Sequence, residues 1–110
     1  MTAGMRTVIY PVKDLAKAKE LYGALLGTEP DSDQPYYVGY TVGDQHVGLD
    51  PNGHSQGMTG YYHVEDIRAT LEQLLAAGAQ TQQDVRDVGG GRLIATVTDP
   101  DGNIIGLLQD

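Results

Sequence analysis

Hydrophobic and polar residues follow the same succession of patterns twice along the 110-residue chain. Residues 7–12 and 59–64 are runs rich in β-branched and aromatic residues, a composition that favours β-strands. An aspartate follows each run, Asp14 in the first half and Asp66 in the second, at the position expected for a helix N-cap. Each half is therefore predicted to begin with a strand that leads into a helix.

Behind each aspartate, apolar residues recur at spacings of three and four, the pattern of a helix with one buried face. The predicted buried positions are Leu15, Ala18, Leu21, Tyr22, Leu25 and Leu26 in the first helix, and Ile67, Leu71, Leu74 and Leu75 in the second. Both segments end at a glycine, Gly27 or Gly78, which is the residue best suited to the left-handed conformation that terminates many helices. These features predict two amphipathic helices.

Three short strand candidates follow each helix, separated by turns rich in Gly, Asp and Pro. They are residues 28–29, 36–42 and 46–50 in the first half, and 80–85, 92–98 and 103–108 in the second. The last strands also match each other, because HVGL and IIGL both centre on a glycine. The sequence thus predicts a single α+β domain made of two βαβββ modules, residues 6–50 and 58–110, joined by a polar linker at residues 51–57.

Composition narrows the classes of partner. The chain has 15 acidic and 7 basic residues, and its formal charge of -8 argues against nucleic acid as a partner. It contains no cysteine, and its first residues lack the pattern of a secretory signal, so we expect a cytoplasmic protein. No apolar segment approaches the roughly 20 residues of a transmembrane helix, and no membrane association is expected. All seven aromatic residues are tyrosines, whose hydroxyl groups need partners when buried.

Two motifs resemble a known family. TVIYPVKDLAKAKELYGALLG is similar to the opening strand, Val-x-Asp-Leu turn and helix of vicinal oxygen chelate proteins, and TDPDGNIIGLLQ is similar to their closing hairpin and strand. The resemblance implies the glyoxalase/bleomycin resistance fold, in which the curved mixed sheets of two βαβββ modules form a cup with the helices outside. It also implies a ligand site within the cup and a homodimer.

Metal-dependent members of this family hold a divalent ion with one residue early in the first strand of each module and one in the last strand. In this sequence the corresponding residues are Thr7, Gly48, Thr59 and Gly106. Glycine has no side chain and a threonine hydroxyl is a weak neutral donor, so we expect no metal or other cofactor at this position. The alternative is a divalent metal at a displaced site formed by the residues His46, Asp50 and His63.

The resemblance and strand alternation together predict which side chains line the cup. The expected ligand-binding residues are Thr7, Ile9, Tyr40, His46, Gly48, Thr59, Tyr61, His63, Arg92 and Gly106. Two interpretations of the strand glycines remain open: they widen the cavity beside a ligand, or they permit tight packing within the sheet. His54 in the linker is expected to be solvated.

Two functions follow from this resemblance. The first is a bleomycin-resistance-like protein that binds a small aromatic or cationic molecule in the cup without a metal. The alternative is an isomerase, lyase or dioxygenase-like enzyme that uses the cup histidines, with His63 as the candidate catalytic residue because histidine titrates near neutral pH. Glu65 either orients His63 or faces solvent. The sequence does not identify the ligand, since one fold serves many functions.

Overall fold

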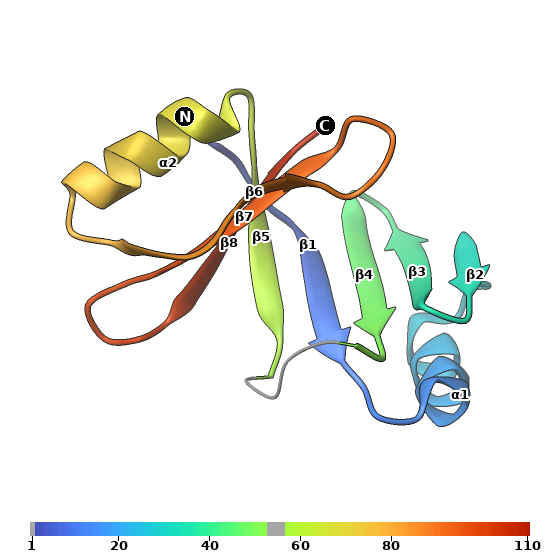
Figure 1. The fold of residues 1–110 in the computed structure, drawn as a ribbon. Helices are drawn as coiled ribbons and strands as arrows, with labels where there is room; N and C mark the ends of the chain where they lie inside the picture. The colour runs from blue at the N-terminus through green and yellow to red at the C-terminus, as the bar shows by residue number, and fades with distance from the viewer. Residues whose placement is uncertain (1, 53–56) are drawn as a thin grey trace. The chain divides into compact units, whose positions relative to one another are not determined.

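The computed structural model describes residues 2–52 and 57–110, so His54 and the middle of the predicted linker lie outside the described residues. The elements appear in the order expected from the two halves of the sequence (Figure 1). They are β1 (Thr2–Pro11), α1 (Leu15–Leu26), β2 (Ser32–Gln34), β3 (Tyr37–Val42), β4 (Gln45–Asp50), β5 (Thr59–Val64), α2 (Ile67–Ala76), β6 (Gln80–Asp87), β7 (Leu93–Thr98) and β8 (Ile104–Gln109). This confirms the predicted α+β fold with two βαβββ modules.

The chain forms two compact units. The first unit comprises Thr7–Thr59, and its strands follow the order β2-β3-β4-β1, with β1 parallel to β4 and the other pairs antiparallel. The second unit comprises residues 2–6 and Gly60–Asp110, with the strand order β5-β8-β7-β6. There β5 is parallel to β8, and the remaining pairs are antiparallel. Strand β1 is therefore divided between the units: residues 2–6 belong to the second unit and the rest of the strand belongs to the first.

In the first unit, α1 packs on one face of the sheet. The core of that face is Val38, Tyr40, Val47 and Leu49, and the residues packed against it are Val8, Tyr10, Val12, Leu15, Ala18, Tyr22 and Leu26. The predicted helix face is confirmed for Leu15, Ala18, Tyr22 and Leu26, whereas Leu21 and Leu25 are 66% and 73% exposed. The apolar residues at spacings of three and four form a stripe on the helix that is wider than the area in contact with the sheet, so the leucines at its edge stay exposed.

In the second unit, α2 covers one face of the sheet in the same way. Its core consists of Val64, Ile67, Leu71, Ala95, Val97 and Leu107. Both predicted N-caps are present, because the carboxylates of Asp14 and Asp66 accept hydrogen bonds from the backbone N–H groups of Lys17 and Ala69 at 3.1 Å. Neither helix in the described residues has the length and apolar character needed to cross a bilayer.

The first short strand was predicted too early. The structure places it at Ser32–Gln34, where Ser32 pairs with Gly39, instead of at residues 28–29. Residues 28–29 follow directly on Gly27, which ends α1 in the left-handed conformation with φ 68°, and Pro30 has no N–H to donate to a neighbouring strand. The other predicted strands agree with the observed ones to within one or two residues at each end, although β1 begins five residues before Thr7.

Candidate functional site

Each sheet has one face covered by a helix and one face without a helix. In the first unit, β1 and β4 pair Thr7 with His46 and Ile9 with Gly48, while β3 and β4 pair Gly39 with Gly48. Because paired residues point to the same side of a sheet, four predicted site residues, Thr7, Ile9, His46 and Gly48, lie together on the helix-free face. We call this surface the first-unit face.

Tyr37 lies across this face. Its hydroxyl is 2.8 Å from Nε2 of His46, and the two rings have centroids 6.2 Å apart and planes inclined by 22°. A Cβ added at Gly48 would lie 2.2 Å from the Tyr37 hydroxyl, and one added at Gly39 would lie 2.9 Å from Cε1 of His46. The glycines thus give the two rings room to lie close to the backbone, and we call these rings the Tyr37–His46 pair.

This arrangement decides between the two interpretations of Gly48. Besides Tyr37, the side chain of Ile9 fills the space above the glycine, with Cδ1 2.6 Å from an added Cβ. Of the two interpretations left open by the sequence, the contacts around Gly48 favour tight packing within the sheet.

Tyr40 does not lie on the first-unit face. It is fully buried on the helix side of the sheet, where its hydroxyl donates a hydrogen bond of 3.0 Å to the backbone carbonyl oxygen of Lys19. Burial also raises the pKa of its phenol. The expectation that Tyr40 lies on the face that lines the cup is therefore wrong: alternation along β3 places Tyr37, three residues earlier, on the open face instead.

The helix-free face of the second unit carries Tyr61, His63 and Gly106. Tyr61 pairs with Gly106 across β5 and β8, and His63 pairs with Leu108. A Cβ added at Gly106 would lie 2.5 Å from Cδ2 of Tyr61 and 2.8 Å from the backbone oxygen of Gly60. A tyrosine ring thus occupies the space beside this glycine as well.

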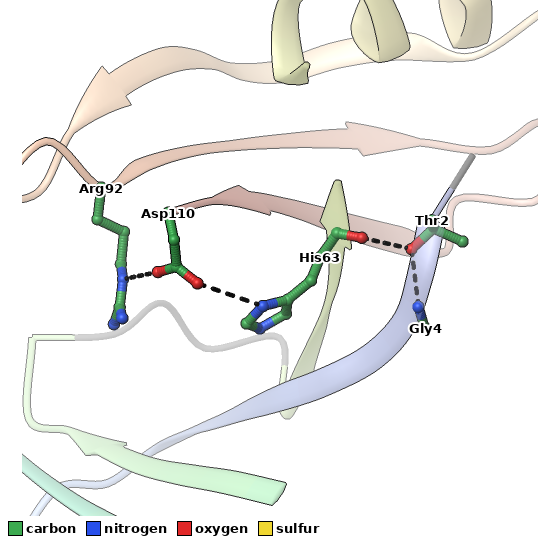
Figure 2. Close-up of polar contacts among 5 residues, drawn as sticks. All are labelled: Thr2, Gly4, His63, Arg92 and Asp110. Atoms are coloured by element: carbon green, nitrogen blue, oxygen red, sulfur yellow. Dashed lines mark hydrogen bonds and ion pairs between the residues drawn. The ribbon is translucent and has the colours of Figure 1, made fainter. Parts of the chain in front are cut away.

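His63 lies in a chain of polar contacts, drawn in Figure 2. Its Nδ1 is 3.7 Å from Oδ2 of Asp110, and Oδ1 of Asp110 accepts a hydrogen bond of 2.8 Å from Nε of Arg92. The backbone oxygen of His63 accepts a hydrogen bond of 2.7 Å from the Thr2 hydroxyl. The sequence identified His63 and Arg92 but missed Asp110, although alternation through Gly106 and residue 108 predicts its face.

The His63 side chain is 21% exposed and borders an open cleft of about 630 Å³. Burial lowers the pKa of His63 below its ordinary value of 6.5; the carboxylate of Asp110 opposes this shift, and the guanidinium groups of Arg6 and Arg92 add to it. The imidazole is therefore neutral at neutral pH. Glu65 is exposed at the same cleft, and the carboxylate in contact with the imidazole is that of Asp110.

The residues at the metal positions of the family do not fit a divalent ion. Thr7 and Thr59 are 5% and 4% exposed and offer neutral hydroxyls, while the positions of Gly48 and Gly106 are filled by neighbouring side chains. Across residues 2–52 and 57–110, no three His, Asp or Glu side chains gather as a metal site would require. The displaced site of His46, Asp50 and His63 would draw on residues of both units and stays a prediction.

The sequence model of the Glyoxalase/Bleomycin resistance protein/Dioxygenase superfamily matches residues 4–107. The chain belongs to this superfamily. The match confirms the family that the two sequence motifs indicated. It extends over both βαβββ modules of the chain. Among curated proteins, no sequence matches the chain.

Solved structures with the same fold carry different names. The chain is similar to an NAD-dependent benzaldehyde dehydrogenase from Legionella pneumophila, with 20% identity, a TM-score of 0.76 and coverage of 94% of this chain and 96% of that one. It is also similar to a superfamily member from Vibrio splendidus 12B01, with 19% identity, a TM-score of 0.73 and coverage of 94% of this chain and 96% of that one. A third similar structure is methylmalonyl-CoA epimerase from Mycobacterium tuberculosis, with 18% identity, a TM-score of 0.74 and coverage of 98% of this chain and 88% of that one. At these identities the similarity shows the fold alone.

Proposed function

We propose that this superfamily member binds a small planar organic molecule on the first-unit face, without a metal. The Tyr37–His46 pair carries the proposal. The two rings are inclined by 22° and joined by a hydrogen bond of 2.8 Å, and both are partly exposed. They offer nearly parallel aromatic surfaces next to each other on the sheet face opposite α1.

Stacking explains why a planar ligand suits this surface. Aromatic pairs in offset or tilted arrangements contribute about 0.5–1.5 kcal/mol beyond the area they bury. The hydrogen bond between Tyr37 and His46 fixes both rings before a ligand arrives, which reduces the entropy lost on binding. Because Gly39 and Gly48 let the rings lie against the backbone, one face of each ring is held by the sheet.

Ligand titrations of matched variants test this proposal. A panel of water-soluble planar aromatic compounds is screened by thermal shift, and binders are titrated by NMR. Tyr37→Leu should weaken binding about tenfold, corresponding to about 1.4 kcal/mol. Tyr36→Leu removes the neighbouring, 63% exposed tyrosine and should leave affinity unchanged. A panel without binders, or equal effects of the two variants, would overturn the proposal.

Metal independence is tested on the same complexes. The affinity of a bound compound should be the same before and after divalent ions are removed with a chelator, because the first-unit face offers no metal-binding set. Loss of binding on chelation, restored by a divalent ion, would contradict this part of the proposal.

A second candidate function is acid–base catalysis by His63. It is favoured by one observation, the contact of His63 Nδ1 with Asp110, whose carboxylate is in turn held by Arg92. A carboxylate at Nδ1 orients an imidazole and stabilises its protonated form during proton transfer. If a ligand of this protein is converted, His63→Gln should abolish turnover, and Asp110→Asn should reduce kcat more than it changes KM. Full turnover by His63→Gln would exclude this role.

We further propose that the protein is cytoplasmic, because it contains no cysteine, and that it forms a homodimer, as the family resemblance implies. Light scattering coupled to gel filtration tests the assembly: a mass of about 24 kDa supports the dimer, because one chain has a mass of 11.8 kDa. A mass of one chain at micromolar concentration would refute it.

A further inference from the structure

The charged groups around the Tyr37–His46 pair indicate which planar molecule the first-unit face would select. We infer that the ligand is a planar cation, such as a protonated or N-alkylated heteroaromatic ring. This inference rests on the proposed function and adds the charge of the ligand to it.

Asp50 is the first carboxylate on this face. It lies two residues beyond Gly48 on β4, so it points to the same side of the sheet. The register pairs Val38 with Leu49, and its continuation by one residue sets Tyr37 opposite Asp50. Residues directly opposite on antiparallel strands have Cβ atoms about 5 Å apart. A ring stacked on Tyr37 would therefore lie within reach of the Asp50 carboxylate.

Asp31 provides a second carboxylate at the other side of the pair. Its Oδ2 accepts a hydrogen bond from the hydroxyl of Thr41, and Thr41 pairs with His46 across β3 and β4. The backbone N–H of Asp31 also donates to the carbonyl oxygen of Gly39 at 2.7 Å, which fixes the residue beside β3. Asp50 thus lies opposite Tyr37 in the continued register, and Asp31 is bonded to the residue that pairs with His46.

Positive charges are kept away from these strands. Residues 7–59 contain seven acidic residues, three lysines and no arginine. None of the lysines lies in a strand, because Lys13 is in the connection between β1 and α1 and Lys17 and Lys19 are in α1. Lys19 is moreover paired with Asp33 at 2.7 Å. Within residues 7–59, the strands therefore carry carboxylates and no lysine or arginine.

Two interactions would then favour a cation over a neutral ring of the same shape. A cation placed over the face of a tyrosine ring is attracted by the negative potential of its π-system. The Asp50 carboxylate adds a Coulomb attraction that weakens with added salt, because it lies at a partly exposed site. A neutral planar molecule gains the stacking contact and neither of these interactions.

The test compares N-methylquinolinium with quinoline, at a pH where quinoline is neutral, in titrations of the intact protein at low salt. The cation should bind at least about tenfold tighter, and Asp50→Asn should remove most of this preference. Asp44→Asn deletes the same charge in the exposed turn between β3 and β4 and should preserve it. Tyr37→Leu should weaken both ligands.

The outcomes distinguish a failure of the inferred ligand charge from a failure of the proposed function. Equal affinity for both probes in the wild-type protein, with loss of both in Tyr37→Leu, would overturn the inference and leave the proposed function standing. A preference for the cation that persists in Asp50→Asn would also overturn the inference, because Asp50 then plays no part in recognition. Absence of binding by both probes, together with a panel without binders, would refute the proposed function itself.

Discussion

Replacement of Gly48 by alanine provides a direct test of how the first-unit face is built. The new Cβ would lie 2.2 Å from the Tyr37 hydroxyl, 2.7 Å from its Cζ and 2.6 Å from Cδ1 of Ile9. Carbon atoms in contact are normally about 3.5–4.0 Å apart, so both side chains must move. The Tyr37 side chain can rotate away from the new Cβ, but its hydroxyl then loses the hydrogen bond to His46.

The expected destabilisation follows from these contacts. Loss of the hydrogen bond costs about 1 kcal/mol, and overpacking in a tightly packed site costs about 1–3 kcal/mol. We therefore expect Gly48→Ala to lower the free energy of unfolding by about 2–4 kcal/mol. For a domain of this size that corresponds to a fall in Tm of about 10 °C.

Urea denaturation followed by far-UV circular dichroism measures the effect. The control is Gly23→Ala in α1, where an added Cβ meets the Tyr40 hydroxyl at an ordinary 3.7 Å. Alanine is favoured over glycine in a helix by up to about 1 kcal/mol, so this variant should be more stable than the wild type. Gly48→Ala should also cost less in a Tyr37→Leu background, where Ile9 alone remains to be displaced. Equal costs in both backgrounds would refute the packing of Tyr37 described above.

Further predictions concern the second unit. Gly106→Ala should cost about 3 kcal/mol or more in urea denaturation, because its Cβ would lie 2.8 Å from the backbone oxygen of Gly60, which cannot rotate away. Burial lowers the pKa of His63, so the unfolded chain takes up the proton more readily, and stability should fall as the pH drops through 6.5 towards the lower folded-state pKa. His63→Gln should flatten this part of the profile of unfolding free energy against pH; an unchanged slope would contradict the assignment. Asp66→Ala should cost about 1 kcal/mol through loss of the α2 N-cap, and a melting temperature equal to that of the wild type would refute the cap.

The fold was largely predictable because its signals are local. Asp14 and Asp66 cap the helices they were predicted to cap, and the repeated patterns define both βαβββ modules. The exposed Leu21 and Leu25 show the limit of such signals, since the sequence places them on the apolar side but does not tell how much of that side the sheet covers. The position of β2 depends on its pairing with β3, which no local pattern encodes.

The site was predicted less completely, because it depends on which side chain fills each space. The sequence showed that Gly48 and Gly106 cannot bind a metal, but the rings that occupy their surroundings come from other strands. Alternation places Tyr37 and Tyr40 on opposite faces of β3, and the pairing of β3 with β4 determines that Tyr37 faces His46 while Tyr40 is buried under α1. Asp110 was missed because its contact with His63 joins residues 47 positions apart.

The division of β1 between the two units also constrains how the chain folds. Residues 2–6 are synthesised before residues 7–59, yet they belong to the unit that continues at Gly60, and Thr2 bonds to His63 across 61 residues. Contacts between such distant residues are slow to form, because a long loop must close before they contribute. The segment 7–59 can acquire its local structure while synthesis continues, whereas the second unit can form only after the residues from Gly60 onward have been made. Residues 2–6 are thus expected to remain without their pairing partners until the segment from Gly60 onward has been synthesised.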